Sequence, residues 1–257
     1  MNLDPNQIEM WKKFLPQSTI EYLLNPTSET LGQSLDGIAT AICWPLLKLR
    51  VIEKAKLEQF AKEIQKKNQQ IPLENRDSSK IGLAIKAIEE ARYQLNEDDI
   101  RKLYVNLISS TVDNRKNNMV SPRLASVVSQ FSPNEAELLK IIYEQRGNQL
   151  PLGYLTVRST KSSNIRIVSG YLCSSDNGNF FSNKDTSIDI LNSLGIIELY
   201  TDQWLAFDTY MKQYKIMENI LKQAVSMTVK DDEKFELNKC YLKLNSFGKS
   251  LCHCIFQ

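Results

Sequence analysis

The chain has 257 residues, of which 42% are hydrophobic and 24% charged, so it can bury one large core or two smaller ones. Its formal net charge of +2 gives no global sign of a protein that binds nucleic acid or anionic membranes. Its apolar runs fall short of the roughly 18–20 residues that a membrane-spanning helix needs.

The five cysteines, an odd number, lie mostly within apolar runs. This pattern is typical of reduced, buried thiols and argues against a disulfide framework. The first residues show no basic region followed by an apolar one, so no secretory signal is expected. We therefore expect a cytoplasmic protein.

The first 68 residues are expected to be largely helical. Residues 1–30 are too apolar for a solvated tail, and we expect them to pack on the body as short helices broken at prolines. Residues 31–68 repeat apolar side chains at helical spacing. A kink or break is expected at Pro45, because proline clashes with the preceding turn and donates no hydrogen bond.

Residues 96–113 carry the most regular helical pattern of the chain. The apolar stripe of this expected central helix consists of Ile100, Leu103, Tyr104, Leu107 and Ile108. Asn96 is a suitable N-cap, and the acidic residues after it favour the first turn, where backbone N–H groups lack partners. A helix that begins at Ser78 or Ser79 is expected to precede it.

Two further helix starts follow the polar loop after residue 113. Ser121-Pro122 opens one helix, and Ser132-Pro133-Asn134-Glu135 opens a second that runs to about Arg146. Proline suits the first helical position, and serine with glutamate three residues later can close a capping box. Gly147 is expected to end this helix.

From Gly147 onward the pattern mixes strands and helices. Strand composition is found at 151–158, 165–168, 196–200 and 235–244, and helical patterns at 185–194, 208–225 and 245–255. The order of a short helix, a glycine, two strands and a closing helix is that of a winged-helix module.

The central helix also carries a family resemblance. The string DDIRKLYVNLISSTVD, followed by SPRLASVVSQFSPNEAELLKII, resembles the signature of the abortive infection alpha (Abi-alpha) family of prokaryotic proteins. In that family an acidic helix start leads into a core of Leu-Tyr-x-Asn-Leu-hydrophobic-small-small, and a later Ser-Pro-x-Glu opens another helix. The resemblance covers residues 31–146 clearly and implies a role in phage defence, but it brings no catalytic residues with it.

These observations predict a mainly α protein, with an N-terminal helical bundle followed by a winged-helix-like α+β domain. The expected parts are a lead at 1–30 that packs on the body, an Abi-alpha-like helical domain at 31–131 and the winged-helix-like domain at 132–257.

In a DNA-binding winged helix, residues 185–194 would enter the major groove. This segment carries Asp185 and Asp189, with Lys184 as the nearby base. Affinity for nucleic acid comes chiefly from lysine and arginine side chains that neutralise phosphates, so the charge argues against nucleic acid as a partner. We favour a winged-helix-like architecture that serves structure or protein contact.

Residues 48–67 carry seven lysines and arginines against three glutamates, directly after an uncharged run. The segment could dock on anionic lipid, with contacts to membrane or partner from Trp44, Lys48, Arg50, Lys54 and Lys56. The alternative is a solvated helix face above a buried stripe, which is the commoner origin of such a pattern. In the Abi-alpha family the segment equivalent to 31–47 is richer in glycine and alanine, and this departure argues against a shared membrane role.

No catalytic, cofactor-binding or metal-binding constellation emerges from the sequence. The single histidine, His253, lies between Cys252 and Cys254, and neighbours on a helix point in different directions. That geometry argues against a zinc site and against a Cys–His dyad. We therefore expect no enzymatic activity, no cofactor and no metal.

The leading interpretation is a non-enzymatic phage-defence protein that acts through protein contact or a membrane surface. Its partner would be another protein, a second copy of the chain or the periphery of the inner membrane. The alternative is a winged-helix DNA-binding regulator, and the surface charge around residues 184–194 distinguishes the two.

Overall fold

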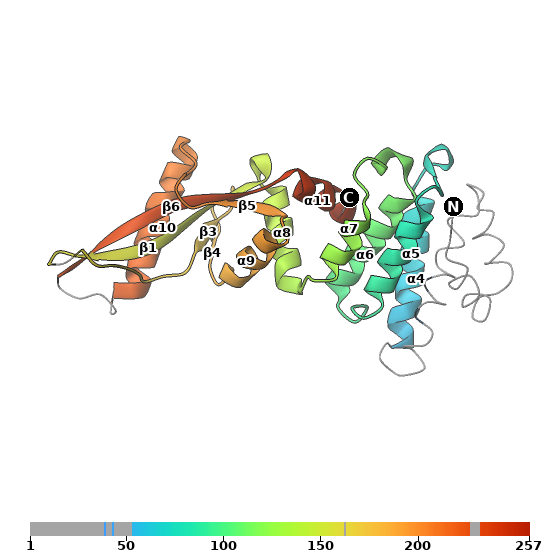
Figure 1. Ribbon diagram of the computed structural model, residues 1–257, viewed down its shortest axis with the longest axis horizontal. Helices are drawn as coiled ribbons and strands as arrows, with labels where there is room; N and C mark the ends of the chain where they lie inside the picture. Colours follow the sequence, from blue (N-terminus) through green and yellow to red (C-terminus); the bar gives the residue numbers. More distant parts are fainter. Residues whose placement is uncertain (1–38, 40–42, 44–52, 162, 227–231) are drawn as a thin grey trace. The chain divides into compact units, whose positions relative to one another are not determined.

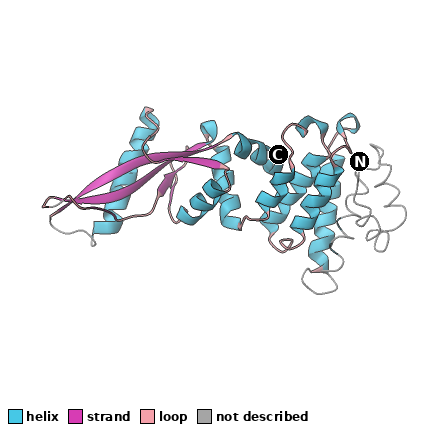
Figure 2. Ribbon diagram, in the orientation of Figure 1, coloured by secondary structure: helices cyan, strands magenta, loops and turns pink. Residues whose placement is uncertain are grey.

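The computed structural model describes residues 39, 43, 53–161, 163–226 and 232–257. Among these residues, eight α-helices, short 3-10 helices and one six-stranded antiparallel sheet form the fold (Figure 1, Figure 2). The class is therefore mixed α/β, which is broader than the expected mainly α class. The expected lead at 1–30 and the expected kink at Pro45 lie outside the described residues.

The described chain forms two compact units. The first contains the described residues up to Pro133 together with Ser250–Gln257, and the second contains Asn134–Lys249. The helix α11, Ser246–Phe256, therefore begins in the second unit and ends in the first. The expected boundary near residue 132 did not anticipate that the last residues pack with the N-terminal helices.

The first unit is built around α6, Asp98–Thr111. This helix packs against α4, Lys54–Gln69, α5, Ile81–Ala91, and α7, Pro122–Val128 (Figure 1). The 3-10 helices η1, Leu73–Asn75, and η2, Asn114–Lys116, lie in the connections. The predicted central helix is confirmed, and so is its buried stripe of Ile100, Leu103, Tyr104, Leu107 and Ile108.

The start of α6 differs from the prediction. Its N-cap is Glu97, whose side chain makes no capping hydrogen bond, so the predicted cap by Asn96 is wrong. The carboxylate of Asp98 in the first turn instead binds Lys56 Nζ and Arg101 Nη1, each at 2.6 Å. The acidic start of the helix therefore also ties α6 to α4.

The second unit contains the sheet, in the order β4-β3-β1-β6-β5, with β2 paired to β1. Two long strands, β1, Gln149–Ser159, and β6, Glu233–Leu244, pair from Gln149 opposite Lys243 to Ser159 opposite Glu233. The shorter strands are β2, Ile165–Ile167, β3, Leu172–Ser174, β4, Phe180–Phe181, and β5, Ile197–Tyr200. The four predicted strands are confirmed, whereas β3 and β4 were not predicted.

Helix α8, Pro133–Glu144, and the 3-10 helix η3, Arg146–Asn148, come before β1 in the chain. Helix α9, Asp185–Ser193, lies between β4 and β5 in the chain. Helix α10, Asp208–Val225, matches its predicted range and packs against β1, β3 and β6 (Figure 1). Its buried face carries Tyr210, Tyr214, Met217 and Leu221, which form a core with Leu155. The Tyr214 hydroxyl donates to the Cys240 carbonyl at 2.7 Å, so this buried phenol is satisfied.

Helix α11 begins against the backbone of the second unit. The Asn245 side chain accepts a hydrogen bond from the Gly248 N–H at 2.8 Å, which is an N-cap interaction, and Gly248 packs directly on the carbonyl group of Ile196. A Cβ at position 248 would overlap the Ile196 carbonyl oxygen. Only glycine therefore fits at this point of the helix.

We expect Gly248→Ala to destabilise the protein by about 1–3 kcal/mol, because the backbone at Ile196 or in α11 must move. At an exposed helix position a change from glycine to alanine would instead stabilise the protein by about 1 kcal/mol. A loss of stability therefore shows that position 248 has no room for a Cβ. The measurement is urea unfolding followed by circular dichroism. The exposed neighbour supplies the control, since Lys249→Ala should change stability by less than about 0.5 kcal/mol. A more stable Gly248→Ala variant would show that the close approach is wrong.

The described ranges contain no helix that is both long and apolar enough to cross a bilayer. All five cysteines are free and buried, as predicted. Burial raises the pKa of Cys254 to about 11 and that of Cys240 to about 12, so these thiols stay protonated near neutral pH.

Candidate functional site: a cationic pocket in the first unit

Of the contact residues proposed from the sequence, Trp44, Lys48 and Arg50 lie outside the described residues. Lys54 is exposed on α4 and lies 3.7 Å from the Glu58 carboxylate. Lys56 is half-buried and binds Asp98. The structure therefore gives both described lysines a carboxylate partner, and neither of them lines the pocket described next.

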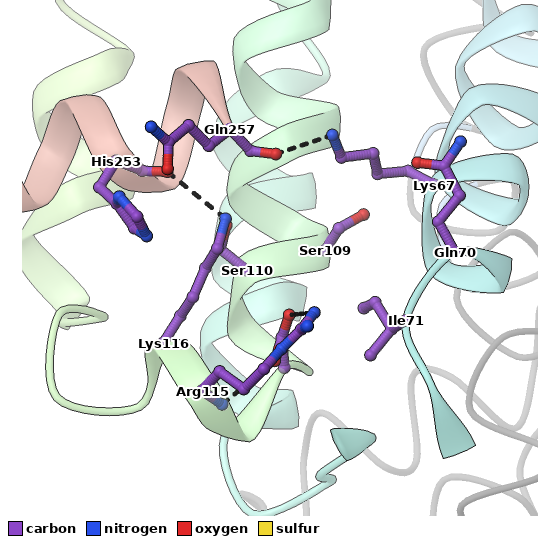
Figure 3. Close-up of a pocket in the computed structure, with 10 residues that line it drawn as sticks. Lys67, Gln70, Ile71, Ser109, Ser110, Arg115, Lys116, His253 and Gln257 are labelled. Carbon is purple, nitrogen blue, oxygen red and sulfur yellow. Dashed lines mark hydrogen bonds and ion pairs between the residues drawn. The ribbon is translucent and has the colours of Figure 1, made fainter. Parts of the chain in front are cut away.

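The first unit instead contains a pocket of about 410 Å³ that the sequence did not reveal (Figure 3). It is formed by the end of α4, the last turn of α6, the segment through η2 and the end of α11. Its lining residues are Lys67, Gln70, Ile71, Ser109, Ser110, Asp113, Arg115, Lys116, His253 and Gln257. Three of these side chains are cationic, and one is a carboxylate.

The pocket lies where several chain ends meet. The basic last turn of α4 supplies Lys67, as is usual at a helix C-terminus. The small residues at the end of α6 supply Ser109 and Ser110, both nearly fully buried. The Asp113 carboxylate accepts the backbone N–H of Arg115 at 3.1 Å, which fixes the turn into η2 and directs Arg115 and Lys116 toward the pocket.

The end of α11 is held in the first unit by side chains around the pocket. Four donors bind consecutive or nearby carbonyls: Asn106 Nδ2 to Ile255 at 2.8 Å, Ser110 Oγ to Cys254 at 2.9 Å, Lys116 Nζ to His253 at 3.4 Å and Lys67 Nζ to Gln257 at 2.8 Å. Helix C-terminal carbonyls have no partner within the helix, so these bonds satisfy them.

Asp113 and Arg115 form a bidentate pair. Arg115 Nε and Nη2 donate to the two oxygens of Asp113 at 2.8 and 2.6 Å. Burial pushes the pKa of Asp113 upward, but hydrogen bonds and charge from Arg115 outweigh it, so this pKa lies below its usual value. The carboxylate is therefore ionised and already neutralised by its own neighbour.

Lys116 and His253 are both affected by burial. Burial lowers the pKa of Lys116, and the positive charges of Lys67 and Arg115 act in the same direction. Burial and the charge of Lys116 also lower the pKa of His253, which favours the neutral imidazole at pH 7. The pocket thus carries its positive charge on lysine and arginine side chains.

The Ser109 hydroxyl differs from the other polar groups of the pocket. Ser109 is 3% exposed, and its Oγ has no hydrogen-bond partner among the described residues. Figure 3 shows this hydroxyl directed into the space between Lys67 and Ile71. A buried hydroxyl without a partner is uncommon, because its desolvation is uncompensated.

Lys116 and Ser110 lie close enough together to be compared with a Ser–Lys catalytic pair. Lys116 Nζ lies 3.1 Å from Ser110 Oγ, which is within hydrogen-bond reach. However, Ser110 is 2% exposed, and its hydroxyl already donates to the Cys254 carbonyl. A nucleophile must reach its substrate, so this pair is better explained as part of the contact that holds α11. The described residues also contain no group of three or more histidine, cysteine, aspartate or glutamate side chains suited to a metal.

The fold and the pocket together describe a mixed α/β protein with a cationic cavity in a helical unit. Residues 52–255 match the model of the abortive infection alpha family, so this chain belongs to that family. No curated protein matches the chain. The solved structure of an uncharacterized protein from the hydrocarbon-degrading marine bacterium Alcanivorax borkumensis SK2 is similar over 56% of this chain and 96% of its own, with 13% identity and a TM-score of 0.29.

The residues of this pocket were not predicted to form a site. Residues 113–118 were expected to be a polar loop, and His253 was set aside both as a zinc ligand and as a member of a Cys–His dyad. No short motif joins them, because they come from four segments between residues 67 and 257. The available signal was local: two adjacent cations, Arg115 and Lys116, lie in the loop that follows a helix ending in buried hydroxyl residues.

Proposed function

We propose that this protein is a phage-defence protein of the abortive-infection type, and that it acts without catalysis through contact with another protein. The observation that carries the proposal is membership of the abortive infection alpha family over residues 52–255. The buried state of Ser110 and the high pKa values of the buried thiols support a non-catalytic role, since neither group is available as a nucleophile.

Protein contact is favoured over a membrane surface by the charges on α4. Lys54 and Lys56 were expected to face anionic lipid, but each has a carboxylate partner, Glu58 and Asp98. A paired lysine contributes less to attraction by an anionic surface. We therefore propose a cytoplasmic protein, and peripheral binding to the inner membrane becomes one outcome of the test.

We propose a winged-helix-like architecture for the second unit. In its support, α9 lies directly before β5, and β5 pairs antiparallel with β6, although helix α10 separates these two strands along the chain. We propose that this architecture serves structure or protein contact. No observation favours the DNA-binding regulator, because Lys184 binds Glu137 and Asp185 accepts the Tyr171 N–H at 2.9 Å.

Binding to mixed-sequence duplex DNA at physiological salt is accordingly expected to be weak or absent. The measurement is fluorescence anisotropy with a labelled duplex over a range of salt concentrations. Sub-micromolar affinity that falls steeply with added salt would instead support the regulator, since such a slope reports the number of neutralised phosphates.

The defence role is tested by phage challenge of bacteria that express the 257-residue chain. We expect fewer plaques than with the empty vector, and death of infected cells before they release phage. Leu107→Ala is a control, because this variant is expressed from the same vector but is expected to be less stable. Weaker protection by the variant would show that protection depends on the folded protein and not on expression alone. Unchanged plaque numbers and unchanged phage release across a broad panel of phages would contradict the proposal.

A charge-reversal variant separates protein contact from membrane contact. It carries Lys48→Glu, Arg50→Glu and Lys54→Glu, and it retains Lys56 because that residue holds Asp98. We expect neither the variant nor the intact chain to float with anionic vesicles, and we expect the variant to protect as well as the intact chain. Flotation of the intact chain alone, together with loss of protection by the variant, would establish the membrane mechanism.

A further inference from the structure

We propose that the cationic pocket of the first unit is a binding site for the phosphate group of a small, soluble molecule. The proposal goes beyond the defence role, because it assigns a ligand class to a cavity without reference to phage. It rests on the unpartnered Ser109 hydroxyl, on three cationic side chains around it and on the size of the cavity.

The Ser109 hydroxyl is the most specific of these observations. Ser109 is 97% buried, yet its Oγ points into the cavity and meets no partner among the described residues. Burial of a hydroxyl without a hydrogen bond costs roughly 1–3 kcal/mol. A ligand oxygen that accepts from this hydroxyl removes that cost, so the side chain is prepared for an acceptor.

The donors around this hydroxyl match a phosphate group. A lysine ammonium has three N–H donors, and within the described contacts Lys67 uses one of them, on the Gln257 carbonyl. The bidentate pair of Arg115 with Asp113 uses Nε and Nη2 and does not use Nη1. Lys116 adds a third positive charge from the opposite side of the pocket. Donors that converge from three segments suit the three terminal oxygens of a phosphate better than the two oxygens of a carboxylate.

The Asp113 carboxylate is the group that opposes an anion at this site. It faces the cavity, but Arg115 binds both of its oxygens and balances its charge. Lys116 therefore remains as a positive charge whose partners, the Ser110 hydroxyl and the His253 carbonyl, are neutral, whereas Lys67 binds the backbone oxygen of the terminal residue Gln257. The field in the cavity favours an anion.

A purely structural role, in which the pocket side chains hold the end of α11, explains only part of how these side chains are arranged. Lys67 and Lys116 bind carbonyls at the end of α11, as cations commonly do at a helix C-terminus. This role does not explain the orientation of Ser109, and it does not explain why Arg115 lines the same cavity.

The size and depth of the pocket decide in favour of a small molecule. A volume of about 410 Å³ lies within the usual range for small-molecule sites, so it holds a phosphate and part of the group that carries it. A bilayer surface or the backbone of a duplex cannot reach a hydroxyl that is 97% buried. Lipid headgroups and nucleic acid therefore serve as comparison ligands.

The test is isothermal titration calorimetry of the intact chain with inorganic phosphate, pyrophosphate and adenosine monophosphate, at constant ionic strength. We expect saturable binding of at least one probe and a rise of the unfolding temperature with its concentration, because a ligand of the folded state stabilises it. Absence of both effects for all three probes up to about 10 mM would overturn the proposal, since that range covers even weak sites.

Ser109→Ala separates a ligand-binding role from a structural one. It removes an unpartnered hydroxyl, so the unfolding temperature without ligand should stay equal or rise. Affinity for the phosphate probe should fall at least tenfold, because a hydrogen bond to a charged group is lost. Unchanged affinity in Ser109→Ala would show that the probe binds elsewhere.

Neighbouring lysines on α4 supply the matched charge control. Lys67→Gln should weaken binding at least tenfold, whereas Lys66→Gln removes the same charge from an exposed position and should leave affinity within twofold. Equal weakening by both changes would indicate diffuse surface attraction and overturn the site. Tighter binding to anionic vesicles or to duplex DNA than to all soluble probes would overturn the small-molecule assignment. None of these assays involves phage, so a failure to bind the probes leaves the defence proposal intact. Likewise, a failure to protect against phage leaves the phosphate site intact.

Discussion

Replacing Arg101 with alanine is expected to lower the free energy of unfolding by about 3–5 kcal/mol, the range for removal of the largest buried side chains. Arg101 is 1% exposed and is among the largest fully buried side chains of the described residues. Its guanidinium donates to the Leu95 carbonyl at 3.2 Å, to Asp98 at 2.6 Å and to Glu63 at 3.3 and 3.4 Å. Alanine leaves a cavity between α4 and α6 and removes all of these bonds.

Arg101→Met decides whether packing or charge contributes most. Methionine fills much of the same volume, and it leaves Glu63 and Asp98 with side chains that are 28% and 55% exposed and can therefore be hydrated. Because desolvation offsets most of the gain from a buried ion pair, we expect this variant to lose less than about 1.5 kcal/mol. Urea unfolding of both variants is the measurement. A methionine variant as unstable as the alanine variant would show that the ion pairs dominate.

The same variant should also move the titration of Asp98. Hydrogen bonds from Lys56 and then from Arg101 lower the pKa of Asp98 from 3.8 to about 2. A carboxyl whose pKa is lower in the folded state stabilises the protein above its unfolded pKa, and that contribution is lost as the pH falls through about 2. In Arg101→Met one donor is absent, so the Asp98 pKa should rise, as followed by carboxyl NMR shifts.

Leu107→Ala is expected to cost about 2–5 kcal/mol, because the side chain is buried in α6 at the centre of the first unit. Leu107 is 1% exposed, and α6 packs against α4, α5 and α7. Rigid neighbours on three sides limit collapse around the cavity, which favours the upper part of the range. Chemical unfolding monitored by circular dichroism measures the loss.

The matched control for this change is Leu73→Ala in η1, where the side chain is 51% exposed. It removes the same atoms from a solvated position, so its effect should stay below about 0.5 kcal/mol. Similar losses for Leu107→Ala and Leu73→Ala would show that burial of the α6 stripe is wrong.

The spacing of apolar residues was sufficient to predict the helices that have one buried face. The stripe of α6 and the range of α10 could be predicted because apolar residues recur at helical spacing in both. The cap of α6 could not, since Asp98 meets Lys56 and Arg101 only after α4 and α6 have packed together. Tertiary contact therefore outweighed the local preference for Asn96.

The pocket was beyond sequence reasoning for a related reason. A net charge of +2 over the whole chain conceals a local concentration of Lys67, Arg115 and Lys116, which lie far apart in sequence. The missing information is that residues 250–257 return to the first unit, because His253 and Gln257 complete the lining only then. From the sequence pattern, residues 250–257 were expected to belong to the domain at 132–257.

The return of α11 to the first unit also has a consequence for how the protein is made. Roughly 115 residues of the second unit separate Pro133 from Ser250, so at about 5–20 residues per second the ribosome needs several seconds more before the last turn of α11 exists. Until then Asn106, Ser110 and Lys116 lack the carbonyls that they bind in the finished protein. Although its helices are synthesised first, the N-terminal unit is completed last, and a chain cut after Pro133 omits part of its own fold.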